Sequence, residues 1–570
     1  MVAPHSSVKP SSIIAYFSME VGLSPEIPTY SGGLGMLAGD TLRAAADMNI
    51  PMVGITLLHR KGYFLQRLDA GGNQIEADAR WVPEEMLQPL EPRVQVIVGG
   101  KTVSVRAWQY TIRGVKGHMV PVYLLDTNLP ENDGYSRTLT DHLYGGDLRY
   151  RLCQEVILGL GGVAVLRAMG HNDVLAYHMN EGHSALLTLA LLEEQSKANQ
   201  DRNICDDDKE AVRRKCVFTT HTPVPAGHDV FSLELAREIV GGKRLDTLLC
   251  TECCLDQTLN MTNLALSLSR YINGVAMYHG EISRTMYPNY PINSITNGVH
   301  SATWTSKPFQ DLYDRHMPEW RRDNLYLRYA VSVPLDEIRQ AHAVAKKDML
   351  DEIQRRTGIA LDPSVMTIGF ARRATAYKRA DLLFSDMERL KNIVSRAGPL
   401  QVIFGGKAHP RDDGGKEIIK RVFESSGALK EVLPVVYLEE YDMGLGKILC
   451  SGVDLWLNTP QKPHEASGTS GMKAALNGVP SFSVPDGWWI EGHVEGITGW
   501  SIGDSWGLNS TSAGESESLY DKLEQVIIPM FYRQPGLFAR VMRSAIGLNG
   551  SFFNAQRMVS QYLENAYLTG

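Results

Sequence analysis

Lys473 is the side chain whose sequence setting most favours covalent chemistry. It lies in PHEASGTSGMKAALNG (463–478), after the apolar run VDLWLN (453–458). The preceding residues offer hydroxyl groups and close-approaching backbone N–H groups for an anion: Ser467, Gly468, Thr469, Ser470 and Gly471. Near a helix N-terminus and other cations the ammonium form is disfavoured, which suits a Schiff-base lysine. For the lysine alone, an ordinary surface position after a glycine-rich turn is a nearly equal alternative.

A basic loop follows the apolar run VMTIGFA (365–371). The loop, ARRATAYKRAD (371–381), carries Arg372, Arg373, Lys378 and Arg379. These cations could lie in solvent, paired with helix carboxylates. At the carboxyl edge of a sheet, however, an arginine guanidinium can form bidentate hydrogen bonds to phosphate oxygens. We therefore favour an anion site.

Two glycine-rich segments differ in their context. SGGLGMLAGD (31–40) precedes the helical pattern TLRAAADMN (41–49), so its N–H groups could hold an anion, with a tight structural turn equally plausible. GLGGVA (159–164) matches a dinucleotide fingerprint but follows a helical pattern, not a strand. We interpret those glycines as sites of close helix packing.

The histidines and cysteines do not predict a metal site. His183, His221 and His228 lack the carboxylate spacing of metalloenzymes. Cys250, Cys253 and Cys254 form a lone CxxCC, which we interpret as free thiols in a helix. Asn297, in ITNGVHSATW (295–304), suits hydrogen bonding to a sugar hydroxyl.

Length, charge and composition limit the number of domains, the kinds of partner and the location of the protein. A chain of 570 residues is expected to form two or three domains. Its net charge of −7 argues against a nucleic acid bound through a broad basic surface. No apolar run reaches membrane-spanning length, and the N-terminus lacks a signal-peptide layout, so a cytoplasmic protein is the default expectation.

Short apolar strands alternate with helical patterns along most of the chain, which predicts a parallel α/β fold. The second half gives the clearer series of strands: 365–371, 400–406, 432–440, 453–458 and 480–485. We expect helices beginning near Ala380, Gly415, Gly444 and Gly471. The aromatic-rich segment 301–336 is expected to connect two domains, and the last segment (552–568) to form one amphipathic helix. Two sheets facing each other would place the motifs above around one cleft.

Several motifs in register resemble the α-glucan (glycogen, starch, maltodextrin) phosphorylases, in a compact form. The strongest is EASGTSGMKAALNG, similar to that family's pyridoxal phosphate motif, with Lys473 as the Schiff-base lysine. Other matching blocks occur in the same order: GGLG (32–35), NEGH (180–183), THT (220–222), TNG (296–298), RRATAYKR (372–379), GGKAHP (405–410) and LEEY (438–441). The resemblance runs from about Tyr16 to the C-terminus.

The resemblance implies two Rossmann-like domains of glycosyltransferase B type facing across a cleft. The expected divisions are 1–304 on the glucan and phosphate side, 305–545 on the pyridoxal phosphate side, and a C-terminal helix (546–570) packing back near the junction. A homodimer is a further family-based expectation. N-terminal phosphorylation and nucleotide-activation elements are not expected.

The resemblance also assigns roles residue by residue. Lys473 would carry pyridoxal 5'-phosphate, surrounded by Arg372, Thr469 and Tyr441. Inorganic phosphate would be held by Arg373, Lys378 and the backbone of Gly33 and Leu34. The glucosyl unit would be bound by His221, Asn297, Glu465, Ser467 and Gly468. Arg373, Lys378 and Lys473 are the expected catalytic residues, and no metal is expected.

The implied reaction is reversible phosphorolysis of terminal α-1,4-glucosyl units to α-glucose 1-phosphate, with retention. The cofactor's phosphate would shuttle a proton to the substrate phosphate. A carboxylate pair at the reacting carbon, as in glycosidases, is not required. The partners would be an α-glucan or maltodextrin, inorganic phosphate and glucose 1-phosphate.

The chain departs from the family pattern at several positions. Ser470 and Gly471 replace Gly-Asn, and Thr375 and Ala376 replace His-Glu. Asp442 replaces an arginine, which could weaken a cation contact. The segment DHLYGGD (141–147) does not reproduce the family's active-site gate. Two alternatives therefore stay open: a nucleotide-sugar α-glucan synthase of the same fold, and a catalytically silent glucan-binding protein.

Overall fold

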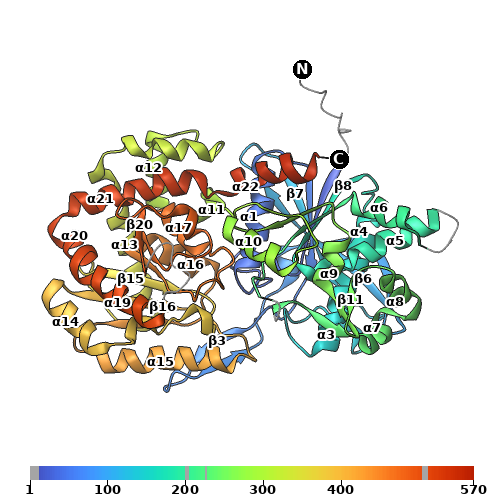
Figure 1. Cartoon of the computed structure of the whole chain (residues 1–570), viewed down its shortest axis with the longest axis horizontal. Coiled ribbons are helices and arrows are strands. Elements are labelled where there is room, and N and C mark those ends of the chain that lie inside the picture. The colour runs from blue at the N-terminus through green and yellow to red at the C-terminus, as the bar shows by residue number, and fades with distance from the viewer. Residues whose placement is uncertain (1–11, 199–203, 225–226, 504–510, 570) are drawn as a thin grey trace.

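The computed structural model describes residues 12–198, 204–224, 227–503 and 511–569. The N-terminal stretch before residue 12, where the sequence shows no signal-peptide layout, lies outside this description. Two large β-sheets organise the chain, one in each half, and helices cover both (Figure 1). The prediction of a mixed α/β protein with parallel sheets is confirmed.

The N-terminal half is built around one sheet, which has nine strands within the described residues. In spatial order they are β14 (Ile292–Ser294), β13 (Tyr271–Gly274), β9 (Cys216–Thr219), β8 (Val174–Asn180), β1 (Ile13–Ser18), β2 (Met52–Leu57), β7 (Met119–Asp126), β6 (Lys101–Arg113) and β5 (Gln88–Val98). The strands from β14 to β7 pair in parallel, whereas β7, β6 and β5 pair antiparallel. The antiparallel edge was not anticipated from the sequence.

Both faces of this sheet are buried. Ala15 and Phe17 of β1 enter one apolar cluster, while Ile14 and Tyr16 enter another. This follows from the two-residue period of a strand, which sends neighbouring side chains to opposite faces. The helices of this half are α1 (Gly33–Asp47), α2 (Pro83–Met86), α3 (Leu148–Val156), α4 (Gly162–Ala168), α5 (Leu187–Ala198), α6 (Asp206–Arg213), α7 (Leu233–Val240), α8 (Gly242–Leu249), α9 (Met261–Ser267) and α10 (Met277–Met286).

The C-terminal half contains an entirely parallel sheet. Its strands, in spatial order, are β17 (Val435–Leu438), β16 (Leu400–Gly405), β15 (Met366–Ala371), β18 (Leu455–Asn458), β19 (Ser481–Ser483) and β20 (Gly499–Ser501). The first five match the strands predicted from the sequence. The chain order reverses between β15 and β18, and sheets of this kind bind ligands at that point.

The helices of the C-terminal half fill the connections and the outer layer (Figure 1). They are α13 (Leu335–Thr357), α14 (Met387–Ala397), α15 (Asp413–Leu429), α16 (Met443–Gly452), α17 (Ser470–Ala475), α18 (Trp489–Gly492), α19 (Ser512–Lys522), α20 (Ile528–Arg533) and α21 (Pro535–Ser544). Helices begin close to three of the four expected positions. The exception is the segment after Ala380, which forms a 3-10 turn before α14.

The segment 301–336 runs between the two sheets but is more ordered than a plain connection. It contains α11 (Ser301–Trp304), α12 (Lys307–His316) and the 3-10 segment η5 (Asn324–Ser332). Trp304 and Trp320 are fully buried. The aromatic residues that obscured a helical period are therefore core residues.

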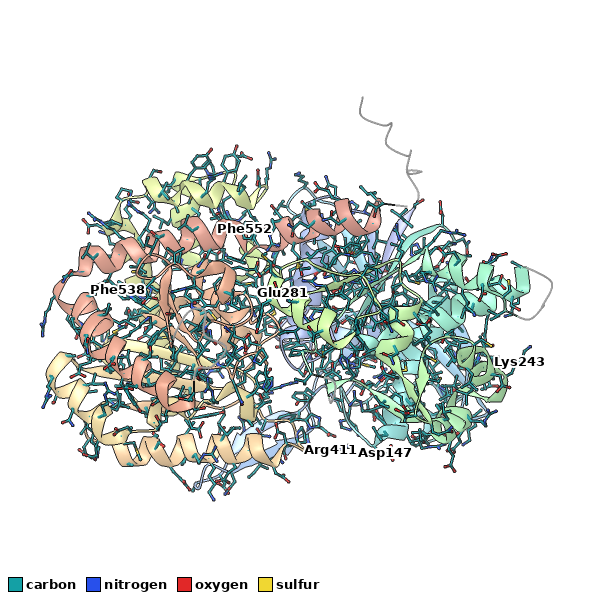
Figure 2. The ribbon with its side chains drawn as sticks, viewed as in Figure 1. Asp147, Lys243, Glu281, Arg411, Phe538 and Phe552 are labelled. Atoms are coloured by element: carbon teal, nitrogen blue, oxygen red, sulfur yellow. The ribbon has the colours of Figure 1, made fainter. Side chains whose placement is uncertain are left out.

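The C-terminal segment crosses back to the N-terminal sheet. Phe552 marks the crossing, and helix α22 (Ala555–Tyr562) follows it (Figure 2). Met558 and Tyr562 join the apolar cluster beneath α1, and the hydroxyl of Tyr567 lies 2.6 Å from His178 Nδ1. The end of the chain is thus part of the N-terminal core.

A hairpin of the N-terminal half reaches the other half. Its strands are β3 (Leu65–Leu68) and β4 (Gln74–Ala77). The Gln66 side chain donates to the carbonyl of Gly406 at 2.8 Å, and the Leu68 N–H donates to Glu439 at 2.8 Å. These hydrogen bonds tie the two halves together beside the cavity described next.

Candidate active site

A cavity of about 630 Å³ lies between the two halves. It is lined by the thirteen residues to which the resemblance assigned roles: Gly33, Leu34, His221, Asn297, Arg372, Arg373, Lys378, Tyr441, Glu465, Ser467, Gly468, Thr469 and Lys473. The loops after β15 and β18 bring the basic loop and the Lys473 motif together at the reversal of strand order. Sequence segments separated by hundreds of residues therefore converge on one site.

Lys473 lies in the first turn of α17 and is only 7% exposed. Its ammonium lies 3.6 Å from the centroid of the Trp304 ring. Burial lowers the pKa of the Lys473 amine, Asp40 opposes this shift, and Arg43 adds to it. Burial, rather than the helix end invoked from the sequence, is the main cause of the lowered pKa. An amine of this kind is suited to covalent bonding with a carbonyl compound.

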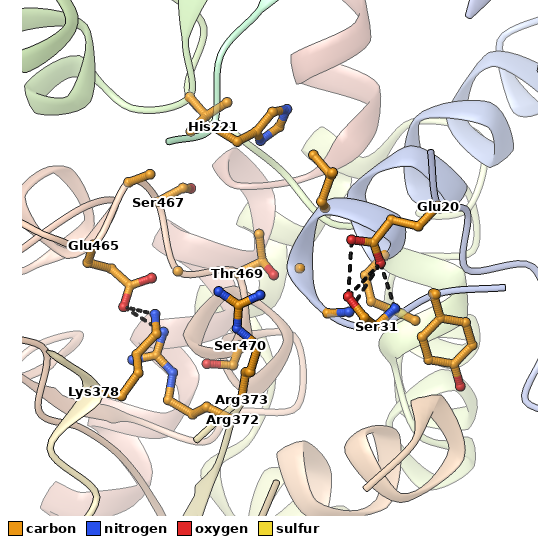
Figure 3. A pocket seen from close by; sticks show the side chains of 18 of the residues that line it. Glu20, Ser31, His221, Arg372, Arg373, Lys378, Glu465, Ser467, Thr469 and Ser470 are labelled. Carbon is orange, nitrogen blue, oxygen red and sulfur yellow. Dashed lines mark hydrogen bonds and ion pairs between the residues drawn. The ribbon is translucent and has the colours of Figure 1, made fainter. Parts of the chain in front are cut away.

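Glu465 is held by two cations of the basic loop. Its carboxylate accepts a hydrogen bond from Arg372 Nη2 at 2.7 Å and another from Lys378 (Figure 3). Burial acts to raise the pKa of Glu465, but these two cations outweigh it and lower the pKa to about 2. Glu465 is therefore an ionised hydrogen-bond acceptor at neutral pH.

Arg373 points away from this cluster. Figure 3 shows its guanidinium directed into the space between the Glu465 loop and the loop that carries Glu20 and Ser31. The protein surrounds the side chain, yet it is solvent-accessible because it projects into the cavity. Among the described residues none forms an ion pair with Arg373. It is an available cation for an anionic ligand.

The N-terminus of α1 meets the same space. No side chain caps this helix at Gly32. The Glu20 carboxylate accepts hydrogen bonds from the N–H groups of Ser31 at 2.6 Å and Gly32 at 3.2 Å. The first N–H groups of a helix have no partner within it, so those of Gly33 and Leu34 suit an anion.

Several buried polar atoms of the cavity wall lack a hydrogen-bond partner among the described residues. They include Asn297 Oδ1, Ser467 Oγ and Arg372 Nη1. Buried polar groups in folded proteins are nearly always hydrogen-bonded, so these atoms indicate a polar ligand. His221 Nε2 donates to Asn180 Oδ1 at 2.6 Å, and burial lowers the pKa of the His221 imidazole to about 4. A neutral imidazole therefore faces the cavity at neutral pH.

Three departures from the family pattern have local explanations. A side chain at Gly471 would place Cβ 2.7 Å from Trp488 Cζ2 and 2.8 Å from Ser481 Oγ, so an asparagine has no room. The Ser470 hydroxyl accepts a hydrogen bond from the Trp456 indole at 3.0 Å. Asp442 caps α16 by accepting from the Leu445 N–H at 2.7 Å. The aspartate thus replaces an arginine at a position that now stabilises a helix end.

Other motifs from the sequence lie elsewhere. The glycines of GLGGVA (159–164) pack inside helical structure, where a Cβ on Gly162 would lie 2.6 Å from Phe17, as the helix-packing interpretation expects. His228 does not line the cavity; its Nδ1 lies 2.8 Å from Thr262 Oγ1. The cysteines are free, but the prediction that they lie in a helix is wrong, because α8 ends at Leu249.

The described residues contain neither a metal-binding cluster nor a helix that could span a membrane. No group of three or more His, Cys, Asp or Glu side chains there is arranged to hold a metal ion. In the same part of the chain, no helix is long and apolar enough to cross a membrane.

An additional polar wall lies on the N-terminal side of the cavity and contains Glu20, Tyr144, Arg151, His183 and, from the other half, Lys407. The sequence marked His183 and Lys407 within matching blocks but assigned a role to none of the five. Tyr144 has a φ of 55° and donates to Glu20 at 3.0 Å. A left-handed backbone at a tyrosine is uncommon and is a sign of a functional constraint, but only the structure reveals it.

Comparison with known proteins bears on this site. A family profile described as carbohydrate phosphorylase matches residues 227–496. The maltodextrin phosphorylase of Thermococcus litoralis is 38% identical over an alignment covering 97% of this chain and 70% of the relative. The glycogen phosphorylases of Mycobacterium tuberculosis and Aquifex aeolicus are 35% and 33% identical, over 97% of this chain and 70% and 86% of their own lengths. The chain belongs to the carbohydrate phosphorylase family.

Proposed function

We propose that the protein is an α-glucan phosphorylase that reversibly converts terminal α-1,4-glucosyl units and inorganic phosphate to α-glucose 1-phosphate, with retention. The observation that carries the proposal is one cavity in which a buried lysine, an uncapped helix N-terminus and an arginine without an ion pair to any described residue meet. The names of the relatives favour phosphorolysis over transfer from a sugar nucleotide.

The cavity residues fit pyridoxal 5'-phosphate. Lys473 would hold it through its amine, with Trp304 packed against that amine at 3.6 Å. Arg372, whose Nη1 has no hydrogen-bond partner among the residues that the structure describes, would meet its phosphate, with Thr469 and Tyr441 beside it. When bound, this group supplies a phosphate that can exchange a proton with the substrate phosphate.

The substrate phosphate would be held from both halves. Arg373 would grip it as a fork, while the N–H groups of Gly33 and Leu34 would donate from the start of α1. Lys378 would neutralise the charge between the two phosphates. Since Lys378 is bonded to Glu465, it must be shared between that carboxylate and the phosphate.

The glucosyl unit would be bound by groups that accept or donate hydrogen bonds but do not transfer protons. Asn297 and Ser467 present unpartnered oxygens, and the Glu465 carboxylate is ionised. Gly468 and the neutral His221 complete this wall. Their role is to fix the sugar so that positive charge develops at the reacting carbon beside the phosphate.

The architecture supports a glycosyltransferase B type protein. We propose the divisions 1–304, 305–545 and 546–570, with the last segment fastening onto the N-terminal sheet through α22. We also propose a homodimer, for which the family resemblance is the sole support.

One experiment separates the candidate functions. The purified protein should show pyridoxal absorbance that borohydride fixes to the Lys473 peptide, and should release glucose 1-phosphate from maltodextrin only when phosphate is present. Activity restricted to a sugar nucleotide would instead support a glucan synthase. Glucan binding without cofactor or turnover would support a silent binding protein.

A further inference from the structure

A buried carboxyl pair lies behind the N-terminal wall of the cavity. Glu155, on α3, is 0% exposed, and neither of its oxygens accepts a hydrogen bond from a donor in the part of the chain that the structure describes. It faces Asp229 in the loop before β10 (Val230–Ser232). Two buried carboxyl groups in contact cannot both be ionised, so one of them holds a proton.

The neighbours decide which carboxyl is ionised. Asp229 contacts Arg151 Nη2 at 2.6 Å and His183 Nε2 at 3.0 Å, whereas Glu155 forms no ion pair with any described residue. Burial and the charge of Asp229 raise the pKa of Glu155. Burial also acts to raise the pKa of Asp229, but His183 and Arg151 outweigh it and lower that pKa. The proton therefore resides on Glu155, which can donate it in a hydrogen bond to Asp229.

Asp229 holds two side chains that reach the cavity. Arg151 and His183 both line it, and both contact the ring of Tyr144, at 5.6 Å from the ring centroid in each case. The second ring nitrogen of His183, Nδ1, is buried and has no hydrogen-bond partner within the described ranges. Without Asp229, neither the guanidinium nor the imidazole would have a fixed orientation.

This wall is distinct from the residues assigned to the transferred unit. Phosphate and cofactor residues occupy the α1 terminus and the C-terminal half, and the glucosyl contacts lie at Asn297, Glu465 and Ser467. Tyr144, Arg151 and His183 line the cavity and have none of these roles, so they are available to the rest of a glucan chain.

We propose that Glu155 and Asp229 form a proton-sharing carboxyl pair that positions His183 and Arg151 for the hydroxyl groups of the glucan beside the transferred unit. The inference rests on the proposed function, because it assumes a glucan in this cavity. Glu155 and Asp229 are positioning residues, since they touch Arg151 and His183 and act on the glucan only through them.

Four variants of the holoenzyme test the pair. Glu155→Leu removes the donor to Asp229 at similar volume, whereas Glu155→Gln supplies an N–H in its place. Asp229→Asn removes the charge that holds both Arg151 and His183. Asp454→Asn is the matched control, because Asp454 is also a buried carboxylate, bonded to His342 at 2.8 Å, but lies away from the cavity.

We expect Glu155→Leu to raise KM for maltodextrin about 10-fold and Asp229→Asn to raise it about 10- to 100-fold, with KM for phosphate changed less than about 2-fold. Glu155→Gln should restore most of what Glu155→Leu loses. Calorimetric titration with maltodextrin in the absence of phosphate should show the same order of affinities. Asp454→Asn should lower the urea midpoint without changing either KM.

Several results would overturn the inference. Equal behaviour of Glu155→Gln and Glu155→Leu would mean that no hydrogen bond from position 155 is needed. Equal rises in both KM values would indicate general loosening of the cleft. If the wild type phosphorolyses maltodextrin and the variants have the same KM values as the wild type, this inference is wrong but the proposed function stands. A wild type that neither binds nor cleaves maltodextrin would overturn the proposed function as well.

Discussion

The ammonium of Lys473 lies 3.6 Å from the centroid of the Trp304 ring, so a cation is held against an aromatic face inside the protein. Trp304 is itself fixed, because its indole N–H donates to Asp40 at 2.7 Å. Trp304 belongs to the segment between the two sheets, and Lys473 belongs to the C-terminal half. The fixed indole therefore gives the lysine a defined surface to pack against, and the contact accounts for a buried amine without a carboxylate in direct contact among the described residues.

Replacing Lys473 should abolish covalent retention of pyridoxal. Burial lowers the pKa of both Lys473 and Lys447, but only Lys473 lines the cavity. After borohydride reduction and digestion, the wild type and Lys447→Met should yield a labelled peptide containing residue 473. Lys473→Met should yield none. Label in that variant at any other lysine would show that the anchor has been misassigned.

Arg373→Ala should abolish phosphate binding while leaving the cofactor in place. Arg373 is an available cation in the cavity, and losing a paired arginine contact to phosphate should lower kcat/KM for phosphate by about 100- to 1000-fold. Pyridoxal absorbance should be unchanged. Arg389→Ala is the control, since Arg389 pairs with Asp521 away from the cavity at 2.5 Å. Normal kinetics in Arg373→Ala would mean that the phosphate site lies elsewhere.

Gly471→Asn, which introduces the residue usual in the family, should destabilise this protein. Its Cβ would meet Trp488 and Ser481 within 2.8 Å, and such overpacking costs about 1–3 kcal/mol. Denaturant unfolding followed by tryptophan fluorescence measures the loss. Gly427→Ala, in α15, meets nothing within 4 Å and should be neutral or stabilising. An unchanged midpoint in Gly471→Asn would show that Trp488 moves freely to make room.

Asp486 should make folding stability fall as pH rises from about 4 to about 7. Burial raises the pKa of Asp486 to about 7, and the charge of Glu465 adds to this shift. The folded state therefore keeps a proton that the unfolded state, with an ordinary carboxyl pKa of about 4, releases within this window. Its contribution is fully present below about pH 4 and is lost above about pH 7. Asp486→Asn should flatten the slope of unfolding free energy against pH there; an unchanged slope would contradict the assignment.

Glu465 should act in the opposite sense and at lower pH. Its pKa is lowered to about 2, so its contribution is present above about pH 4.5 and is lost as pH falls through 2. Glu465→Gln should therefore be less sensitive to acid between pH 2 and 4.5 than the wild type. Measurements of unfolding free energy against pH in Asp486→Asn and Glu465→Gln therefore distinguish these two neighbouring carboxyl groups, because each acts in a different pH range.

The sequence alone predicted the class of fold and thirteen of the residues that line the cavity. Strand and helix periods, being local, gave the first five strands of the C-terminal sheet and the position of Lys473 in the first turn of a helix. Glycine-rich turns and the basic loop marked anion sites because their chemistry is carried by neighbouring residues. The resemblance to a family supplied the roles.

Tertiary structure alone decided which groups are charged, paired or available. Glu465 and Lys378 lie 87 residues apart in sequence and bond only because β15 and β18 are neighbours. The Glu155–Asp229 pair, the Trp304 contact and the return of α22 to the N-terminal core are likewise long-range. The burial of a residue and its electrostatic partners depend on residues that are distant in sequence, so a local sequence pattern cannot predict them.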